Sequence, residues 1–369
     1  MILRKLLSVA LISVCLCCSS SCFAEPEHTE DTTGTVTSVE ETVAKETTGL
    51  SVSDTEAETT ETTEAEEDTN APMWLEAPDN ITIESDTDFV LGDYLSYIDD
   101  YDSMVDMDVE GEVDTSITGT YPITVTLTDD AGNQTSKDIN VSVIEPLPPP
   151  SETEDGPEPA ADYYDFNDFM ADYSSEGAMY GIDISKYQGD VDFEKVKAAG
   201  CDFVIMRAMV YYKGELKIDD KFKNNIVAAK AAGLKVGVYI YTFANTEELI
   251  REQTIELCEL LDGEQLDFPV VFDWERFSNF QQYNLSMVDL RELYQVFKEK
   301  LAGYGYDAML YSSKYYLETI WKPEGETVWL AHYTSQTTYE GDYVMWQANC
   351  FGSIDGIEGP VDLDLYYGE

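Results

Sequence analysis

Basic residues are scarce in this 369-residue chain. It contains 21 Lys and Arg against 74 Asp and Glu, which gives a formal net charge of −53. Of the basic residues, 17 lie between Lys186 and Lys322, so that the 42 acidic residues between positions 25 and 180 face only Lys45 and Lys137. A chain without a basic surface cannot neutralise a phosphate backbone. This excludes nucleic acid as a partner and disfavours an anionic membrane surface.

Cysteine and histidine are also few. Four of the seven cysteines lie within the first 22 residues, and the others, Cys201, Cys258 and Cys350, have no C-x-x-C spacing. We therefore expect neither a disulfide framework nor a zinc site, and predict free thiols. Of the two histidines, only His332 lies in the C-terminal half, which disfavours Ser-His and Cys-His catalytic arrangements.

The N-terminus has the pattern of a secretory signal. Arg4 and Lys5 precede an apolar run that continues to about Cys18, and small residues lead to Ala24. We expect residues 1–24 to be removed on export, because the apolar run is too short for a membrane-spanning helix. An alternative interpretation is a lipoprotein signal with a lipid anchor at Cys22. Both interpretations place the mature chain outside the cell, secreted or held at its surface or wall.

Composition divides the chain ahead of its last domain. Residues 25–70 are rich in Thr and Glu and poor in apolar residues, which predicts a disordered acidic spacer. Residues 71–145 alternate apolar and polar residues in short runs, with a turn signal at 129–133, and predict an all-β antiparallel sandwich. Residues 146–179 are rich in Pro and acidic residues and are expected to form a linker.

The stretch GEVDTSITGTYPITVTLTDDAGNQTSKDINVSV in this sandwich resembles bacterial immunoglobulin-like modules. No residue in it suggests catalysis, so the resemblance implies a domain that binds a ligand or acts as a spacer. An acidic group in the same domain could hold calcium but lacks the glycine of an EF-hand loop, and we favour a solvated acidic loop. The group comprises Asp99, Asp100, Asp102, Asp106 and Asp108.

Residues 180–369 alternate strand-like apolar runs with helical ones, which predicts parallel β/α architecture. Strands are expected at 181–185, 203–209, 236–242, 270–274, 308–312, 328–333, 344–348 and 361–365, and helices at 192–199, 219–232, 246–261 and 286–303. The predicted fold class is α/β: an irregular (β/α) barrel of five β/α units and then three closely spaced strands, preceded by the all-β immunoglobulin-like sandwich.

Acidic residues lie at three of the predicted strand ends. Asp183 lies in the first strand, Asp273 and Glu275 end the fourth, and Asp362 lies in the eighth. The strand ends of such a barrel face its active site, and a carboxylate there costs stability unless it is used or paired. Asp273 and Glu275 face the same side, about 6.6 Å apart at ~3.3 Å per residue. Paired carboxylates of this kind suit glycoside hydrolysis, in which one group is the general acid.

Seven motifs spread over residues 181–369 resemble those of glycoside hydrolase family 25 lysozymes: GIDISKYQG, FVIMRA, AAGLKVGVYIYTFA, PVVFDWE, WLAHY, MWQ and GPVDLDLY. The resemblance implies a modified β/α barrel that cleaves the β-1,4 bond after N-acetylmuramic acid in peptidoglycan. It makes Glu275 the general acid, and Asp273 the group that orients the substrate N-acetyl group or stabilises its developing charge. Asp183 and Asp362 complete the catalytic cluster. The resemblance implies no cofactor and no metal.

Two departures from the family pattern concern the mouth of the barrel. The last strand carries Asp364 where the family usually has Asn, which adds a charge that raises neighbouring pKa values. The third strand reads Tyr239-Ile240-Tyr241, where many members carry a Tyr-His pair. Both departures bear on substrate preference more than on activity.

Six residues are candidates for substrate binding. Five aromatic side chains are candidates for stacking on sugar rings, with packing inside the barrel as the alternative. Arg207 is a candidate for binding the muramyl lactate group, with pairing to a clustered carboxylate as the alternative. The aromatic candidates are Tyr239, Tyr241, Trp274, Tyr333 and Trp346.

The sequence therefore predicts a monomeric, secreted peptidoglycan hydrolase whose partner is the peptidoglycan glycan strand. One alternative is a catalytically weak protein that binds wall carbohydrate or adheres to a partner, and the intact Asp-x-Glu pair argues against it. Another is a hydrolase of a different N-acetylated polysaccharide such as chitin, which would share every catalytic residue.

Overall fold

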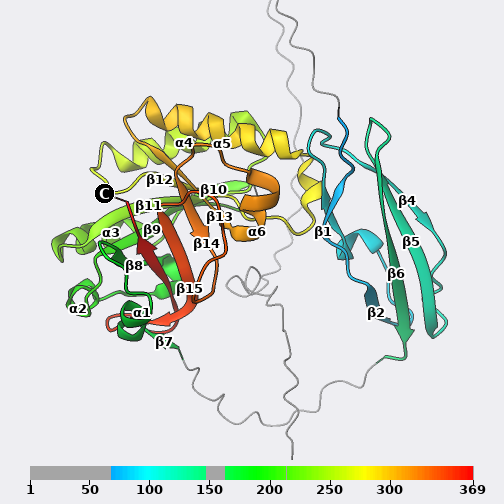
Figure 1. The fold of residues 1–369 in the computed structure, drawn as a ribbon, viewed down its shortest axis with the longest axis horizontal. Coiled ribbons are helices and arrows are strands. Elements are labelled where there is room, and N and C mark those ends of the chain that lie inside the picture. The colour runs from blue at the N-terminus through cyan, green and yellow to red at the C-terminus, as the bar shows by residue number, and fades with distance from the viewer. Residues whose placement is uncertain (1–67, 147–162, 213, 369) are drawn as a thin grey trace, which may run out of the picture. The chain divides into compact units, whose positions relative to one another are not determined.

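The strands of the C-terminal half close into a barrel in the computed structural model, which describes residues 68–146, 163–212 and 214–368 (Figure 1). Around the barrel the order is β8 (Met179–Ile184), β9 (Phe203–Tyr212), β11 (Lys235–Tyr241), β12 (Val270–Asp273), β13 (Ala308–Ser313), β14 (Val328–Ala331), β15 (Met345–Ser353) and β16 (Val361–Tyr366). Pairing of β8 with both β9 and β16 closes the ring. All eight predicted strands are confirmed.

Four helices follow strands at the predicted places: α2 (Phe193–Ala198), α3 (Phe222–Ala231), α4 (Glu247–Leu261) and α5 (Met287–Ala302). Local sequence fixes where three of them begin, because Asp192, Thr246 and Ser286 accept hydrogen bonds from backbone N–H groups of the first turn. After α3, Gly233 takes the left-handed conformation (φ 78°) that ends the helix. Figure 1 shows α4 and α5 side by side over the barrel.

The last strand runs in the opposite direction to the other strands of the barrel. Strands β8, β9 and β11 to β15 run parallel, whereas β16 is antiparallel to both of its neighbours. Only seven residues, 354–360, separate β15 from β16, too few for the crossover that a parallel strand requires. The beginning of β16 therefore lies at the end of β8, where Asp362 is the register partner of Asp183.

Alternate residues of each strand face different cores. In β12, Val271 belongs to a core inside the barrel, whereas Phe272 packs in the outer core with the helices. The inner core also contains Ile205, Trp329 and Met345 from other strands. These apolar residues fill the barrel, so that the polar residues at the strand ends lie at its mouth.

Aromatic residues ahead of β8 belong to the barrel unit, although the predicted linker extends to 179. β7 (Tyr164–Asp165) pairs with β15, and α1 (Phe166–Asp172) buries Phe166 and Phe169 in the outer core. The barrel unit therefore begins before residue 180. The remaining elements of this half are β10 (Glu215–Ile218), which pairs with β9, and the short helical turns η2 (Lys186–Gln188), η3 (Phe280–Tyr283), α6 (Lys314–Tyr316) and η4 (Leu317–Trp321).

The N-terminal domain is all β, as predicted. It contains β1 (Met73–Glu76), β2 (Asn80–Glu84), β3 (Ser96–Ile98), β4 (Asp106–Glu110), β5 (Gly119–Thr128), β6 (Gln134–Ile144) and the short helix η1 (Leu91–Tyr94). The predicted turn at 129–133 joins β5 to β6, and β1 pairs with β3 in a second, two-stranded sheet. The prediction of a purely antiparallel sandwich is wrong in one respect. β2 pairs parallel to β6, which is possible because no short turn connects these two strands.

Several predictions fall on residues that are not described. They are the signal with its alternative anchor at Cys22, the spacer up to residue 67, and the linker between 147 and 162. Within the described residues, Cys201 and Cys258 are buried free thiols, as predicted, and Cys350 is half-buried. None of the helices in these residues is both long and apolar enough to cross a membrane.

Candidate active site

The mouth of the barrel brings together the four carboxylates predicted to be catalytic. Asp183 lies one residue before the end of β8, Asp273 ends β12, and Glu275 follows two residues later. Asp362 joins them because β16 runs antiparallel and begins beside the end of β8. Asp183 and Asp273 are buried, and Glu275 and Asp362 are half-buried. Carboxyl groups so close together in a desolvated site cannot all be ionised at neutral pH.

Burial sets the protonation of Glu275. The pKa of Glu275 is raised to about 7, because removal from water and the negative charge of Asp183 outweigh the lowering effect of a hydrogen bond with Tyr311. A carboxylic acid with this pKa retains its proton near neutral pH and still loses it readily. These are the properties that a general acid requires.

Asp273 experiences the same burial and the negative charges of Glu275 and Asp183, which together raise its pKa well above the usual range. The Arg207 guanidinium lowers the pKa of Asp273 and so favours its ionised form. Its Oδ1 atom is buried and has no hydrogen-bond partner among the described residues. Asp273 therefore presents an acceptor atom for which a substrate N–H group is a suitable partner.

Gln347 links several of these groups, and sequence reasoning missed its role. Its Nε2 donates to Asp183 Oδ2 (2.6 Å), and its Oε1 accepts from the hydroxyl groups of Tyr311 and Tyr333 (2.8 Å each). Burial raises the pKa of Asp183 to about 6, although the hydrogen bond from Gln347 lowers it. Gln347 lies in the MWQ motif, and this motif could have indicated that the residue belongs to the site. Its partners come from strands far apart in the sequence.

Asp364 is fully buried beneath the mouth. Its Oδ1 accepts a hydrogen bond from Trp329 Nε1 (3.0 Å), whereas Oδ2 lacks a donor among the described residues. Burial and the charges of Asp183 and Asp362 raise the pKa of Asp364 well above its usual range. Its hydrogen bond with Asp183 raises the pKa of Asp364 and lowers that of Asp183. The raised pKa therefore favours the protonated form of Asp364 beside Asp183.

The five aromatic candidates divide into two groups. Tyr239, Tyr241 and Tyr333 lie beside the carboxylates: burial and, to a smaller extent, the carboxylate charges raise the pKa values of all three hydroxyls. The Tyr333 side chain is 45% exposed. Trp274 is 0% exposed and donates from Nε1 to Ala244 O (3.2 Å). Trp346 is also buried and donates to the backbone of His332. Both tryptophans pack in the outer core, in agreement with the packing alternative, so we do not include them in the site.

Arg207 lies at the mouth but is held by another residue. Its Nε donates to Asp219 Oδ2 (2.9 Å), one terminal nitrogen forms an ion pair with the same oxygen (2.7 Å), and both side chains are buried. Its charge nevertheless reaches the site, where it lowers the pKa values of Asp273 and Tyr239. Arg207 thus contributes a fixed positive charge beside the carboxylates.

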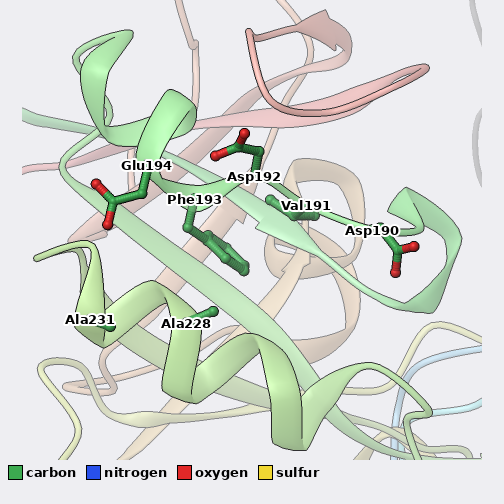
Figure 2. Close-up of a pocket in the computed structure, with 7 residues that line it drawn as sticks. All are labelled: Asp190, Val191, Asp192, Phe193, Glu194, Ala228 and Ala231. Carbon is green, nitrogen blue, oxygen red and sulfur yellow. The ribbon is translucent and has the colours of Figure 1, made fainter.

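A hollow elsewhere on the barrel is not part of this site. Figure 2 shows it between the segment 190–194 and the α3 residues Ala228 and Ala231. None of the sequence-predicted site residues lines it. We therefore assign the candidate chemistry to the mouth.

Comparison with known proteins matches both structural halves to families. Residues 182–357 match the model of the glycosyl hydrolases family 25, and residues 73–143 match that of the Ig-like domain of bacterial surface proteins. The first match includes Asp183, Asp273 and Glu275 and ends before Asp362 and Asp364.

Two relatives are described as lysozymes. The autolytic lysozyme of Clostridium acetobutylicum is 30% identical over 191 residues, which are 51% of this chain and 56% of the relative. Lysozyme M1 of Streptomyces globisporus is 27% identical over 204 residues, which are 52% of this chain and 68% of the relative. The match thus spans little more than half the length of the autolytic lysozyme.

A solved structure of a family 25 glycosyl hydrolase from Bacillus anthracis matches with a TM-score of 0.43 at 22% identity, covering 52% of this chain and 89% of that one. The residues matched by the two models lie within the barrel and the β domain described above, and the first match leaves out β16. Residues 73–143 of the chain are therefore similar to a bacterial immunoglobulin-like domain, and residues 182–357 are similar to the glycosyl hydrolases of family 25.

Proposed function

We propose that the barrel hydrolyses peptidoglycan at the β-1,4 bond between N-acetylmuramic acid and N-acetylglucosamine. The observation that carries the proposal is the Glu275 carboxyl, whose pKa is raised to about 7 beside the buried Asp273 at the mouth of the barrel. The family match and the lysozymes among the relatives support the choice of substrate.

Glu275 would act as the general acid. Its proton passes to the glycosidic oxygen while the bond from that oxygen to the anomeric carbon breaks, and Glu275 becomes a carboxylate. The carboxylate then accepts a proton from the water that attacks the anomeric carbon, which restores the acid. Burial favours the protonated starting form, and rotation of the Tyr311 O–H from Gln347 to Glu275 would stabilise the ionised form that follows.

Asp273 would hold the substrate N-acetyl group. Its unpartnered Oδ1 is suited to accept the acetamide N–H, and this bond would direct the acetamide oxygen toward the anomeric carbon. Arg207 supports this role because its charge favours the ionised form of Asp273. Asp183 and Asp362 would tune the two reacting carboxyls through their charges. Tyr239, Tyr241 and Tyr333 would contact the sugar rings.

We further propose that residues 1–24 direct export, or that Cys22 anchors the chain, so that the enzyme acts on the wall from outside the membrane. The spacer and the immunoglobulin-like domain would then set the distance between the attachment point and the barrel. Cell fractionation of a tagged chain, with and without Cys22→Ala, distinguishes a released enzyme from an anchored one.

The test of activity uses the mature chain on purified peptidoglycan, with new reducing ends reduced by borohydride and identified by mass spectrometry. We expect reduced N-acetylmuramic acid ends from the wild type and from Glu324→Gln, which alters an exposed carboxyl outside the site, and none from Glu275→Gln. Reduced N-acetylglucosamine ends would indicate cleavage of the other bond. Absence of any new end, with protein that sediments with the walls, would contradict hydrolysis and favour a binding protein.

A further inference from the structure

A second group of carboxylates lies in the immunoglobulin-like domain. Carboxylate oxygens of Asp68, Asp99 and Asp100 all lie within 4.8 Å of one another, and Asp68 forms a similar group with Asp102 and Asp129. These residues come from three segments: the chain before β1, the loop after β3, and the turn between β5 and β6. Segments distant in the sequence thus place acidic side chains in two neighbouring groups that share Asp68.

Asp99 is the central observation. Its side chain is 1% exposed, so the expectation of a solvated loop is wrong at this residue. Asp99 Oδ1 accepts from the backbone N–H groups of Tyr101 (2.9 Å) and Asp102 (2.8 Å), whereas Oδ2 is buried with no hydrogen-bond partner. A buried carboxylate oxygen without a partner costs free energy, and an ion that reaches it would recover that cost.

The neighbours of Asp99 show the same pattern. Asp68 Oδ2 and Asp100 Oδ1 are also buried without a partner, while Asp100 Oδ2 accepts from Asn70 Nδ2 (2.7 Å). Among the ion pairs formed by the described residues, none involves these carboxylates. Burial and the charges of Asp100 and Asp68 raise the pKa of Asp99, as expected where acidic groups face one another without a counter-ion.

We propose that Asp68, Asp99 and Asp100 bind a calcium ion through their three unpartnered oxygens. An all-oxygen ligand set without His or Cys suits a hard cation and disfavours zinc or copper. Calcium accepts irregular sets of six to eight oxygen ligands, whereas magnesium requires a regular octahedron and retains its waters. Asp102 and Asp129, which group with Asp68, add negative charge near the site.

The ion would attach the start of the domain to its body. Asp68 precedes β1, and Asp99 and Asp100 follow β3, the strand that pairs with β1. Binding across these segments would stabilise the folded domain against the unfolded chain, in which the three residues are far apart. The inference is independent of the proposed hydrolysis, since none of these residues belongs to the barrel.

The test is calorimetric titration of calcium chloride into the metal-free mature chain, with magnesium chloride at equal ionic strength as the comparison. We expect saturable calcium binding, and an affinity for magnesium that is lower by at least about tenfold. We also expect the melting transition of the β domain to rise by about 5 °C or more at saturating calcium. Asp99→Asn should abolish the binding. Asp106→Asn, an exposed aspartate on β4 of the same domain, should retain it.

Asp68→Asn provides a second variant if Asp99→Asn does not fold, since Asp68 precedes the first strand. Absence of calcium binding to the wild type would overturn the proposal. So would equal binding of both metals, or equal loss of calcium affinity in Asp106→Asn and Asp99→Asn, because either result indicates general attraction of cations to an acidic surface.

Discussion

Two clusters of five carboxylates in this chain, one in each domain, differ in what surrounds them. In the barrel, neutral donors reach the cluster: Gln347 donates to Asp183, Trp329 to Asp364, and Tyr311 hydrogen-bonds with Glu275. In the immunoglobulin-like domain, three oxygens face one another with no donor among the described residues. The same acidic side chains are therefore accommodated in two different ways. Burial and mutual repulsion keep protons on the barrel cluster, although the hydrogen bonds with Gln347 and Tyr311 oppose this effect. In the other cluster, three buried oxygens without a partner are suited to a cation.

The comparison is tested most strongly by removing the acid of the barrel. Glu275→Gln retains the shape of the side chain but cannot donate a proton, so we expect kcat on peptidoglycan to fall by about 10² to 10⁴-fold. The same variant should bind calcium as the wild type does. Steady-state kinetics and calorimetry on one preparation measure both. A fall in kcat of less than about threefold would show that the barrel cluster does not supply its proton from Glu275.

The second prediction concerns Asp364 and asks whether the raised pKa values of the buried barrel carboxyls make the free energy of unfolding depend on pH. Because the pKa values of Asp183 and Asp364 are raised on folding, the folded chain binds more protons than the unfolded chain above about pH 4. The free energy of unfolding of the barrel should therefore decline as pH rises from about 4 through 6 and beyond.

Asp364→Asn removes one of these buried acids while its amide can still donate to Asp183 and accept from Trp329. We expect the melting temperature at pH 8, measured in chelator, to rise by about 2–4 °C. The decline in stability with pH should also become smaller. A lower melting temperature at pH 8 than that of the wild type would contradict the protonated form assigned to Asp364.

The smallest effect concerns the aromatic residues of the mouth. Tyr333→Ala removes a half-exposed ring and one hydrogen bond to Gln347, so we expect KM to rise several-fold with a smaller change in kcat. Trp274→Phe should leave KM unchanged and lower thermal stability, because its side chain lies wholly in the outer core. A larger change in KM for Trp274→Phe than for Tyr333→Ala would contradict the assignment of Tyr333 to the site and of Trp274 to the core.

Local signals made the barrel strands and helices predictable from the sequence. Apolar runs such as 270–273, and N-caps such as Thr246 and Ser286, determine the structure of residues close to them in the sequence. The parallel pairing of β2 with β6 could not be predicted in this way, because it joins strands about 60 residues apart. Likewise, the aromatic residues of α1 were indistinguishable from a tyrosine-rich linker until their packing was known.

The candidate site was predictable where one motif carried two residues, as with Asp273 and Glu275. The contacts of Gln347 with Asp183 and Tyr311 depend on barrel closure and strand register, which no local pattern records. The burial of individual acidic side chains could not be predicted from the sequence either. It distinguishes Asp99 from the exposed Asp106 and Asp108, which are equally acidic in the sequence.

The most direct test of the central claim, that Glu275 acts as a protonated acid, is the pH dependence of kcat/KM on peptidoglycan for the wild type and Tyr311→Phe. For the wild type we expect kcat/KM to fall as pH rises through about 7, where Glu275 loses its proton. In Tyr311→Phe the hydrogen bond that lowers the pKa of Glu275 is lost, so the fall should move to higher pH. A rate that remains constant up to pH 9, or a fall at the same pH in both proteins, would contradict the claim.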